Sequence, residues 1–333
     1  GVSMDYAKIV QFTDNVHIID IGTASTNGNS RVTLTNLELT YNTVQPAANT
    51  SAIAIYSQNL WFSRIENIVI SNVFTGLGGS AGASDYFFSN IVKHIRVKGY
   101  SGYGLRFYKG TGCTFENIYV SGGSSNTFNT AITAFYFEEL HQSAYIQINA
   151  EWATLNIAAE WRTCRGFTII GMNNEGIRVT GSTQGFFKFS YGSLGTVFGL
   201  TLGGSAEGYS GGVQGIFVIE STCSIGVHSM RTGTLAPNGA GSLYLVYHRN
   251  SSYNNATFEF HNLDYDSTTT LTGFFRSGTT TNGDAAWRGA VLTKLNNMFN
   301  LDGAPTLVRD ENYTYYNEVG NGHIIAGTTL TAN

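Results

Sequence analysis

The chain has 333 residues, among them 40 Gly, 19 Tyr and 21 Phe, with only 3 Pro and 12% charged residues. This composition is typical of strands and turns and excludes a helix-rich protein. The net charge of −4 predicts no basic surface for nucleic acid or an anionic membrane. We expect neither a membrane-spanning segment nor a secretory leader in this sequence.

A short repeat, in which a small residue precedes an apolar-x-apolar triplet, recurs along the chain and predicts strands with one buried face. In chain order the copies are Ala52–Ile55, Gly104–Phe107, Ala134–Phe137, Thr154–Ile157, Gly176–Val179, Gly215–Val218 and Ser242–Leu245. We expect the second and fourth residues of each copy to point inward. The fourth residues would then form one apolar stack.

A second family of strands precedes the first in most repeats. Its members cover residues 65–70, 95–97, 118–120, 146–148 and 167–170. From Val97 through Val120 and Ile148 to Ile170 the spacing is about 22 to 28 residues, which matches one coil of a solenoid. A sandwich or a propeller would instead show Asn-Gly or Asp-Gly turns at short, even spacing. The sequence therefore predicts an all-β fold, a parallel β-helix.

We expect the β-helix to cover residues 1–285 as one domain. The Gly-rich residues 185–213 are interpreted partly as an extra coil and partly as an excursion loop. After residue 285 the alternation is lost. Residues 286–333 are therefore expected to form a terminal coil with a capping or intersubunit segment, because an exposed solenoid end would template aggregation.

The three cysteines predict neither a disulfide framework nor a zinc site, since their number is odd and no Cys-x-x-Cys occurs. Cys113, Cys164 and Cys223 each follow the small residue of their repeat by about eight to ten positions, so we expect buried thiols in a shared slot. Such thiols indicate folding in a reducing cytosol. No metal or other cofactor is predicted.

The stacked repeats, the Asn-Ile-x-apolar segments at Asn67–Ile70 and Asn117–Val120, and the Gly/Ser/Thr/Asn turns resemble the pectin-lyase-like right-handed parallel β-helix superfamily. Within it they are most similar to bacteriophage tailspikes. The resemblance covers about residues 9–290 as a pattern, and the motifs of plant-type polygalacturonases and pectate lyases are not found.

The resemblance implies a parallel homotrimer on the phage tail. Such a trimer would be joined to other virion tail proteins and would act at the host cell surface. Its partner would be a bacterial surface polysaccharide: capsule, O-antigen or teichoic acid. No nucleic acid, membrane insertion or cofactor is implied.

Outward positions of successive repeats combine aromatic, basic and acidic groups, which sugars need for stacking, hydroxyl recognition and acid–base chemistry. We predict Glu138 and Glu160 as catalytic acid and base. A lattice estimate places their Cα atoms about 8 Å apart, which matches the wider, inverting separation of glycosidase carboxylates. The substrate-binding residues are predicted to be Arg106, Tyr108, Tyr136, Asn156, Trp161 and Arg178. The same outward side chains could equally pack in a trimer interface.

Several alternatives stay open at this point. Glu151 competes with the chosen carboxylates, whereas Glu139 is expected in a turn, and His141 is the histidine nearest to them. Asp264 and Asp266 could bind calcium or cap a turn, and Glu175 and Glu207 are further carboxylates to consider.

The predicted activity is that of an endo-acting glycoside hydrolase, with a lyase as the alternative reaction. The alternative functions are a non-catalytic glycan-binding spike and a cell-surface adhesin passenger. Esterase chemistry has no support, because no Gly-x-Ser-x-Gly elbow occurs.

Overall fold

The computed structural model describes residues 6–21, 29–79, 86–123, 129–180, 184–203, 208–237 and 240–249, and the backbone of three further strands up to residue 296. The chain forms two compact units. Unit 1 comprises Gly1–Leu155 and Cys164–Ile170, and unit 2 comprises Asn156–Thr163 and Gly171–Asn333.

All regular structure in the described residues is β-strand, with no helix among them. Unit 1 contains β1 (Ala7–Gln11), β2 (Ile19–Ile21), β3 (Asn29–Ser30), β4 (Thr33–Tyr41), β5 (Ile53–Ser57), β6 (Leu60–Trp61), β7 (Arg64–Ser71), β8 (Thr75–Gly78), β9 (Phe87–Phe88), β10 (Ile91–Lys98), β11 (Tyr103–Thr111), β12 (Thr114–Ser121) and β13 (Asn129–His141). Strands β14 (Ala144–Arg162) and β15 (Arg165–Thr180) contribute residues to both units. Unit 2 contains β16 (Gln184–Ser190), β17 (Ser193–Leu202), β18 (Gly208–Ser210), β19 (Gly212–Ile219), β20 (Cys223–Thr232), β21 (Ala236–Pro237), β22 (Gly241–His248), β23 (Asn255–Tyr265), β24 (Gly273–Ser277) and β25 (Ala290–Asn296).

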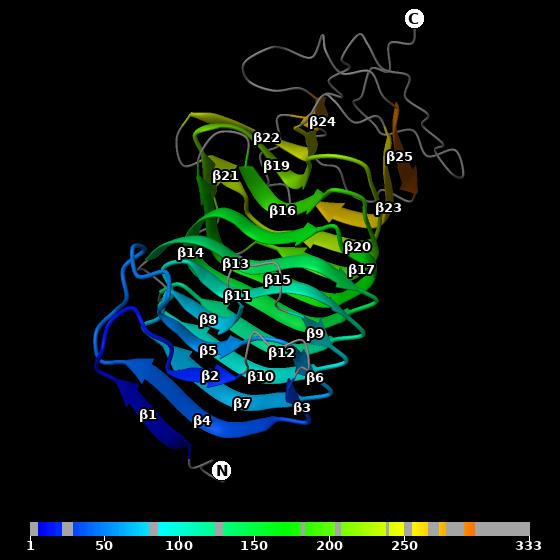
Figure 1. The fold of residues 1–333 in the computed structure, drawn as a ribbon. Coiled ribbons are helices and arrows are strands. Elements are labelled where there is room, and N and C mark those ends of the chain that lie inside the picture. Colours follow the sequence, from blue (N-terminus) through cyan, green and yellow to red (C-terminus); the bar gives the residue numbers. More distant parts are fainter. Residues whose placement is uncertain are drawn as a thin grey trace, which may run out of the picture. The chain divides into compact units, whose positions relative to one another are not determined.

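Each strand pairs in parallel with the equivalent strand of the next coil, so each unit is a parallel β-solenoid (Figure 1). The predicted all-β, parallel β-helix architecture is therefore confirmed. No helix of the described residues is long and apolar enough to cross a membrane.

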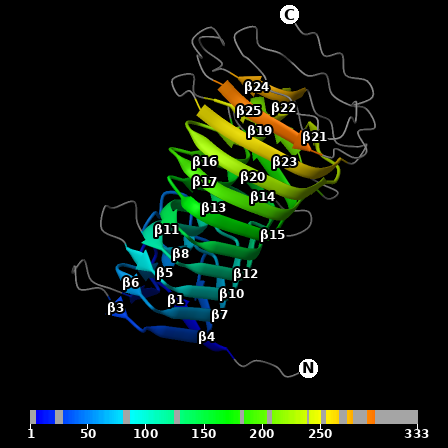
Figure 2. The ribbon, with the colours of Figure 1, turned by 90° about the vertical axis from the view of Figure 1, so that its right-hand side faces the viewer.

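The first strand column of unit 1 runs through β4, β7, β10, β12 and the first part of β14, and Figure 2 shows its first four members side by side. Its central inward residues are Leu37, Ile68, Ile95, Ile118 and Ile148. From Ile68 onward all of them are buried. The second predicted strand family is thus a real column of the core.

Each strand of this column bends just before its central inward residue. The bend residues are Asn36, Asn67, His94, Asn117 and Gln147, with positive φ angles between 52° and 59°. Asparagine tolerates this left-handed backbone better than most residues with a side chain. The Asn-Ile-x-apolar motif is therefore a bend residue followed by a buried strand.

The repeat strands form a second column in unit 1, built from β5, β8, β11 and β13. The rings of Phe107 and Phe137 stack with centroids 6.4 Å apart and planes 8° from parallel, as predicted. Ile55 pairs with Leu77, which in turn pairs with Leu105. The prediction that Ile55 stacks in register with Phe107 is wrong by two residues, and it overlooked the coil that contains β8.

The small residue that opens a repeat makes room for a valine of the other column. A Cβ on Gly76 would lie 2.7 Å from Cγ2 of Val97, and one on Gly104 would lie 2.3 Å from Cγ1 of Val120. Both distances are shorter than real Cβ contacts. Packing between the two columns therefore requires the small position of the pattern.

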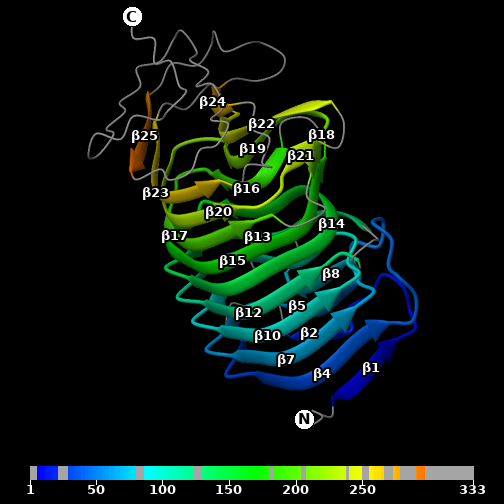
Figure 3. The same cartoon turned by 180° about the vertical axis from the view of Figure 1, so that it is seen from behind.

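In unit 2, β17, β20 and β23 form one column, visible in Figure 3, and β16, β19 and β22 form another. Phe217 pairs with Phe187, their rings 5.7 Å apart. Val218 is 1% exposed, so its predicted burial is confirmed. Its register partner is Lys188, however, so the predicted register of the stack is wrong by one residue here. Strands β16 to β18 and the start of β19 occupy the described part of residues 185–213. The part of the prediction that concerns an excursion loop stays a prediction, because residues 204–207 lie outside the described residues.

The three cysteines are free and buried. In unit 1 the Cys113 and Cys164 thiols each donate to a backbone carbonyl, of Phe87 at 3.0 Å and of Phe137 at 3.4 Å. Burial raises the pKa of the Cys113 thiol to about 12, so it stays protonated and unreactive at neutral pH. Apart from β25, the predicted cap at residues 286–333 lies outside the described residues.

Candidate functional site

Arg106 on β11 lies over two tyrosine rings in unit 1. Its Cζ lies 4.7 Å from the ring centroid of Tyr103 and 5.8 Å from that of Tyr108. Its Nε donates a 3.1 Å hydrogen bond to the backbone carbonyl of Gly79. The side chain points outward, as its place in the repeat predicts, yet only 8% of the residue is exposed. The guanidinium is thus fixed by cation–π contacts and one backbone acceptor.

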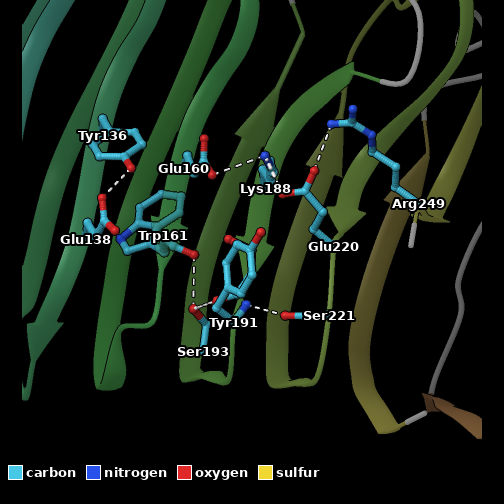
Figure 4. A network of polar contacts seen from close by, with 11 residues as sticks. Tyr136, Glu138, Glu160, Trp161, Lys188, Tyr191, Ser193, Glu220, Ser221 and Arg249 are labelled. Atoms are coloured by element: carbon cyan, nitrogen blue, oxygen red, sulfur yellow. Dashed lines mark hydrogen bonds and ion pairs between the residues drawn. The ribbon is translucent and has the colours of Figure 1, made fainter. Parts of the chain in front are cut away.

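Tyr136 and Glu138 on β13 complete this group, since they are the register partners of Arg106 and Tyr108 on β11. The Tyr136 hydroxyl donates a 2.6 Å hydrogen bond to Oε2 of Glu138 (Figure 4). The Tyr136 ring also lies 5.9 Å from that of Tyr103 and 5.6 Å from that of Tyr108. We name these five residues the tyrosine cluster.

The tyrosine cluster combines ring faces, a guanidinium and a carboxylate on adjacent strands. The tyrosines and Glu138 are half-buried, so each keeps part of its side chain at the surface. Partly exposed rings beside a fixed carboxylate can stack on a sugar and accept its hydroxyl protons. The repeat pattern did not single out Tyr103, because this residue precedes the small position.

A second polar group lies in unit 2. Lys188 Nζ is 3.2 Å from Oε1 of Glu160 and 2.8 Å from Oε2 of Glu220, and Arg249 Nη1 is 2.8 Å from Oε1 of Glu220 (Figure 4). Glu160 and Lys188 are register partners on β14 and β16, whereas Glu220 and Arg249 directly follow β19 and β22. We name these four residues the charge ladder.

Two residues of the charge ladder are buried, and Glu220 and Arg249 are half-buried. Glu160 is 7% and Lys188 8% exposed. Burial raises the pKa of Glu160; Lys188 and Arg162 oppose this shift, and Glu220 adds to it. A carboxyl group with a raised pKa suits a general acid. The carboxylates of Glu160 and Glu220 both contact Nζ of Lys188. The two acidic side chains therefore share one ammonium group.

The repeat pattern pointed to Glu160 but to none of its three partners in the charge ladder. Lys188, Glu220 and Arg249 follow Glu160 at intervals of about one coil. A search for charged residues repeated at coil spacing could therefore have found them. The pattern alone could not show that they touch, because sequence spacing does not determine which coil positions face each other.

The other predicted substrate-binding residues have separate surroundings. Asn156 is exposed on β14, and Arg178 is half-buried on β15, where it pairs with Gly208 of β18. Trp161 is 0% exposed and stacks on Phe189, with ring centroids 5.4 Å apart. We therefore correct the assignment of Trp161 as a sugar-stacking surface: its ring belongs to the core of unit 2.

The two predicted catalytic carboxylates belong to different units, with Glu138 in unit 1 and Glu160 in unit 2. Their 8 Å separation and their shared role stay predictions. The competing Glu151 accepts a 2.6 Å hydrogen bond from the Tyr119 hydroxyl. Glu175 is half-buried. Glu207, Asp266 and the side chain of Asp264 lie outside the described residues.

Among the described residues, no group of three or more His, Cys, Asp or Glu side chains could hold a metal ion. No protein-family model, curated protein or solved structure matches the chain.

Proposed function

We propose that the chain is the β-helix of a bacteriophage tailspike that binds a bacterial surface polysaccharide along its outer face and hydrolyses it. The solenoid provides long outward ladders of side chains, on which a linear polymer can lie. Right-handed winding, which parallel crossover connections favour, and a parallel homotrimer are parts of this proposal. Sedimentation at micromolar concentration tests the trimer, and a monomer would contradict it.

The tyrosine cluster is the observation that carries the proposal. It brings three tyrosine rings together with Arg106 and Glu138 on two adjacent strands. The Tyr136 hydroxyl donates a 2.6 Å hydrogen bond to Glu138. Carbohydrate sites need this combination of aromatic faces and fixed polar groups. A merely solvated face would not require a guanidinium to lie over two tyrosine rings.

The proposed reaction is hydrolysis of a glycosidic bond. Glu160, whose pKa is raised by burial, is proposed as the general acid that protonates the departing oxygen. Glu138 is proposed as the general base that takes a proton from the attacking water. A lyase reaction is the alternative for the same carboxylates.

A second candidate function is glycan binding without cleavage. It is favoured by the burial of Glu160, which is 7% exposed and in contact with Lys188. A carboxylate in that position serves the stability of the coil without reaching a substrate. Under this alternative the tyrosine cluster would bind the polysaccharide, and no new reducing ends would form.

An assay for released reducing ends on capsule, O-antigen and teichoic acid preparations separates the two candidates. If the chain is a hydrolase, Glu138→Gln and Glu160→Gln should each lower turnover at least about a hundredfold while binding is retained. Glu116→Gln is the matched control, because Glu116 is a half-buried glutamate on β12 outside the tyrosine cluster. Binding without turnover by the unmodified protein would establish the non-catalytic spike instead.

A further inference from the structure

Unit 1 contains an open hollow of about 640 Å³ that neither the tyrosine cluster nor the charge ladder explains. Its wall includes Tyr86 and Phe88, whose rings stack at 5.6 Å and 12°. Lys109, Glu139, His141 and Arg165 also line it. The volume falls within the range of roughly 300 to 1,000 Å³ for small-molecule sites.

The backbone around the hollow is fixed by hydrogen bonds between coils. The amides of Ser89, Gly112 and Gln142 donate to the carbonyls of Thr111, His141 and Arg165 at 2.8, 3.0 and 2.8 Å. Each of the three donor residues has a positive φ, which turns the chain sharply at the same place in successive coils. The lining residues therefore sit on or beside an ordered stack of turns, so the hollow exists before any ligand binds.

Cationic groups outnumber acidic ones in the hollow. Arg165 is exposed, and within the part of the chain that the structure describes no ion pair joins it to a carboxylate. Lys109 Nζ lies 5.9 Å from the Tyr86 ring centroid. Glu139 is the one carboxylate among the lining residues. An anionic ligand would therefore be attracted.

His141 adds a donor of known orientation. Its Nδ1 accepts a 3.2 Å hydrogen bond from the backbone amide of Arg165, so the neutral ring carries its proton on Nε2. Burial, aided by the Arg165 charge and opposed by Glu139, lowers the pKa of His141. At neutral pH the imidazole is thus a neutral donor beside two cations.

We propose that this hollow binds an anionic saccharide unit. The sugar ring packs against Tyr86 and Phe88, and its carboxylate or phosphate faces Arg165 and Lys109, while His141 donates from Nε2. Arg165 can form a bidentate contact with either anion. This inference rests on the proposed function and narrows its substrate class to acidic polysaccharides.

Calorimetric titration of the full chain tests the hollow with three probes: a glucuronate-containing oligosaccharide, a glycerol-phosphate oligomer and a neutral maltooligosaccharide. We expect binding of at least one anionic probe and none of the neutral one. Arg165→Gln and Lys109→Gln should each weaken that binding about tenfold or more, because a charge-assisted contact is lost. The probe that binds identifies carboxylate or phosphate as the anion.

Arg96→Gln is the matched control, because Arg96 is exposed on β10 of the same unit and lies over Tyr119, outside the hollow. This variant should bind like the unmodified protein. The inference is overturned if neither anionic probe binds, if the neutral probe binds equally well, or if Arg165→Gln and Arg96→Gln behave alike.

The same titrations separate this inference from the proposed function. Suppose that Glu138→Gln abolishes polysaccharide turnover while Arg165→Gln leaves binding of the anionic probes unchanged. Saccharide binding in the hollow is then refuted, and the proposed hydrolase activity is supported. Suppose instead that Arg165→Gln removes binding of an anionic probe but that the unmodified protein neither binds nor cuts a surface polysaccharide. Binding in the hollow is then supported, and the proposed tailspike function is refuted.

Discussion

Lys188 Nζ lies 3.2 Å from Oε1 of Glu160, and both side chains are only 10% exposed. Replacing Lys188 by Met leaves the Glu160 carboxylate buried without its closest cation. Breaking a buried pair in this way costs about 3 to 5 kcal/mol, and denaturant unfolding measures the loss. A second substitution, Glu160→Gln, should recover part of it.

The matched control for that prediction is Lys93→Met in unit 1. Lys93 Nζ contacts Glu66 at 3.6 Å, and its side chain is 24% exposed. More exposed pairs contribute roughly 0 to 1 kcal/mol, so this variant should unfold nearly like the unmodified protein. Equal losses in the two lysine variants would contradict a special role for the charge ladder.

The pH dependence of stability should report Glu160. Burial raises its folded-state pKa above the ordinary value of 4.5. The folded state therefore favours the protonated form of Glu160. The resulting contribution to the free energy of unfolding is fully present below pH 4.5 and is lost as the pH rises through the folded-state pKa. The glutamine side chain of the Glu160→Gln variant cannot titrate. The free energy of unfolding of this variant should therefore fall less over this pH interval than that of the unmodified protein. Parallel curves for the two proteins would show that the pKa of Glu160 does not change on folding.

Binding of an anionic saccharide in the hollow should strengthen on mild acidification. The lowered pKa of His141 keeps the ring neutral at pH 7, and protonation at lower pH adds a positive charge beside Arg165 and Lys109. Glu139 also lines the hollow, and its charge opposes the lowering of the His141 pKa. Titration of the anionic probe between pH 7 and 5.5 checks this. His141→Gln should abolish the increase, and an unchanged increase in that variant would rule out His141 as its source.

The aromatic core of unit 1 should depend strongly on Phe137. This residue is 0% exposed and packs against Phe107, Phe115 and Tyr145, with ring centroids 6.4, 5.0 and 4.5 Å away. Phe137→Ala should lower the unfolding free energy by about 3 to 5 kcal/mol. Phe62→Ala, at a residue that is 64% exposed, should have little effect. Similar unfolding midpoints for the two variants would place Phe137 outside the core.

The sequence by itself determined the strands and the parallel solenoid. Alternation of apolar residues identified a buried face in each repeat, and the Asn-Ile motif at Asn67 and Asn117 marked the bends. Both signals are local, because side-chain direction along a strand and tolerance of a positive φ depend on the residue and its neighbours.

Only the tertiary structure decided the register of the coils and the contacts of the polar groups. Side chains of a strand alternate with a period of two residues, so a register shift of two residues keeps the same face inward. For this reason the sequence pattern aligned Ile55 with Phe107, whereas in the structure Ile55 is in register with Leu105. The contact of Lys188 with Glu160 and Glu220 joins residues about one coil apart. Such contacts arise when coils stack, and no local pattern along the chain encodes which charges then meet.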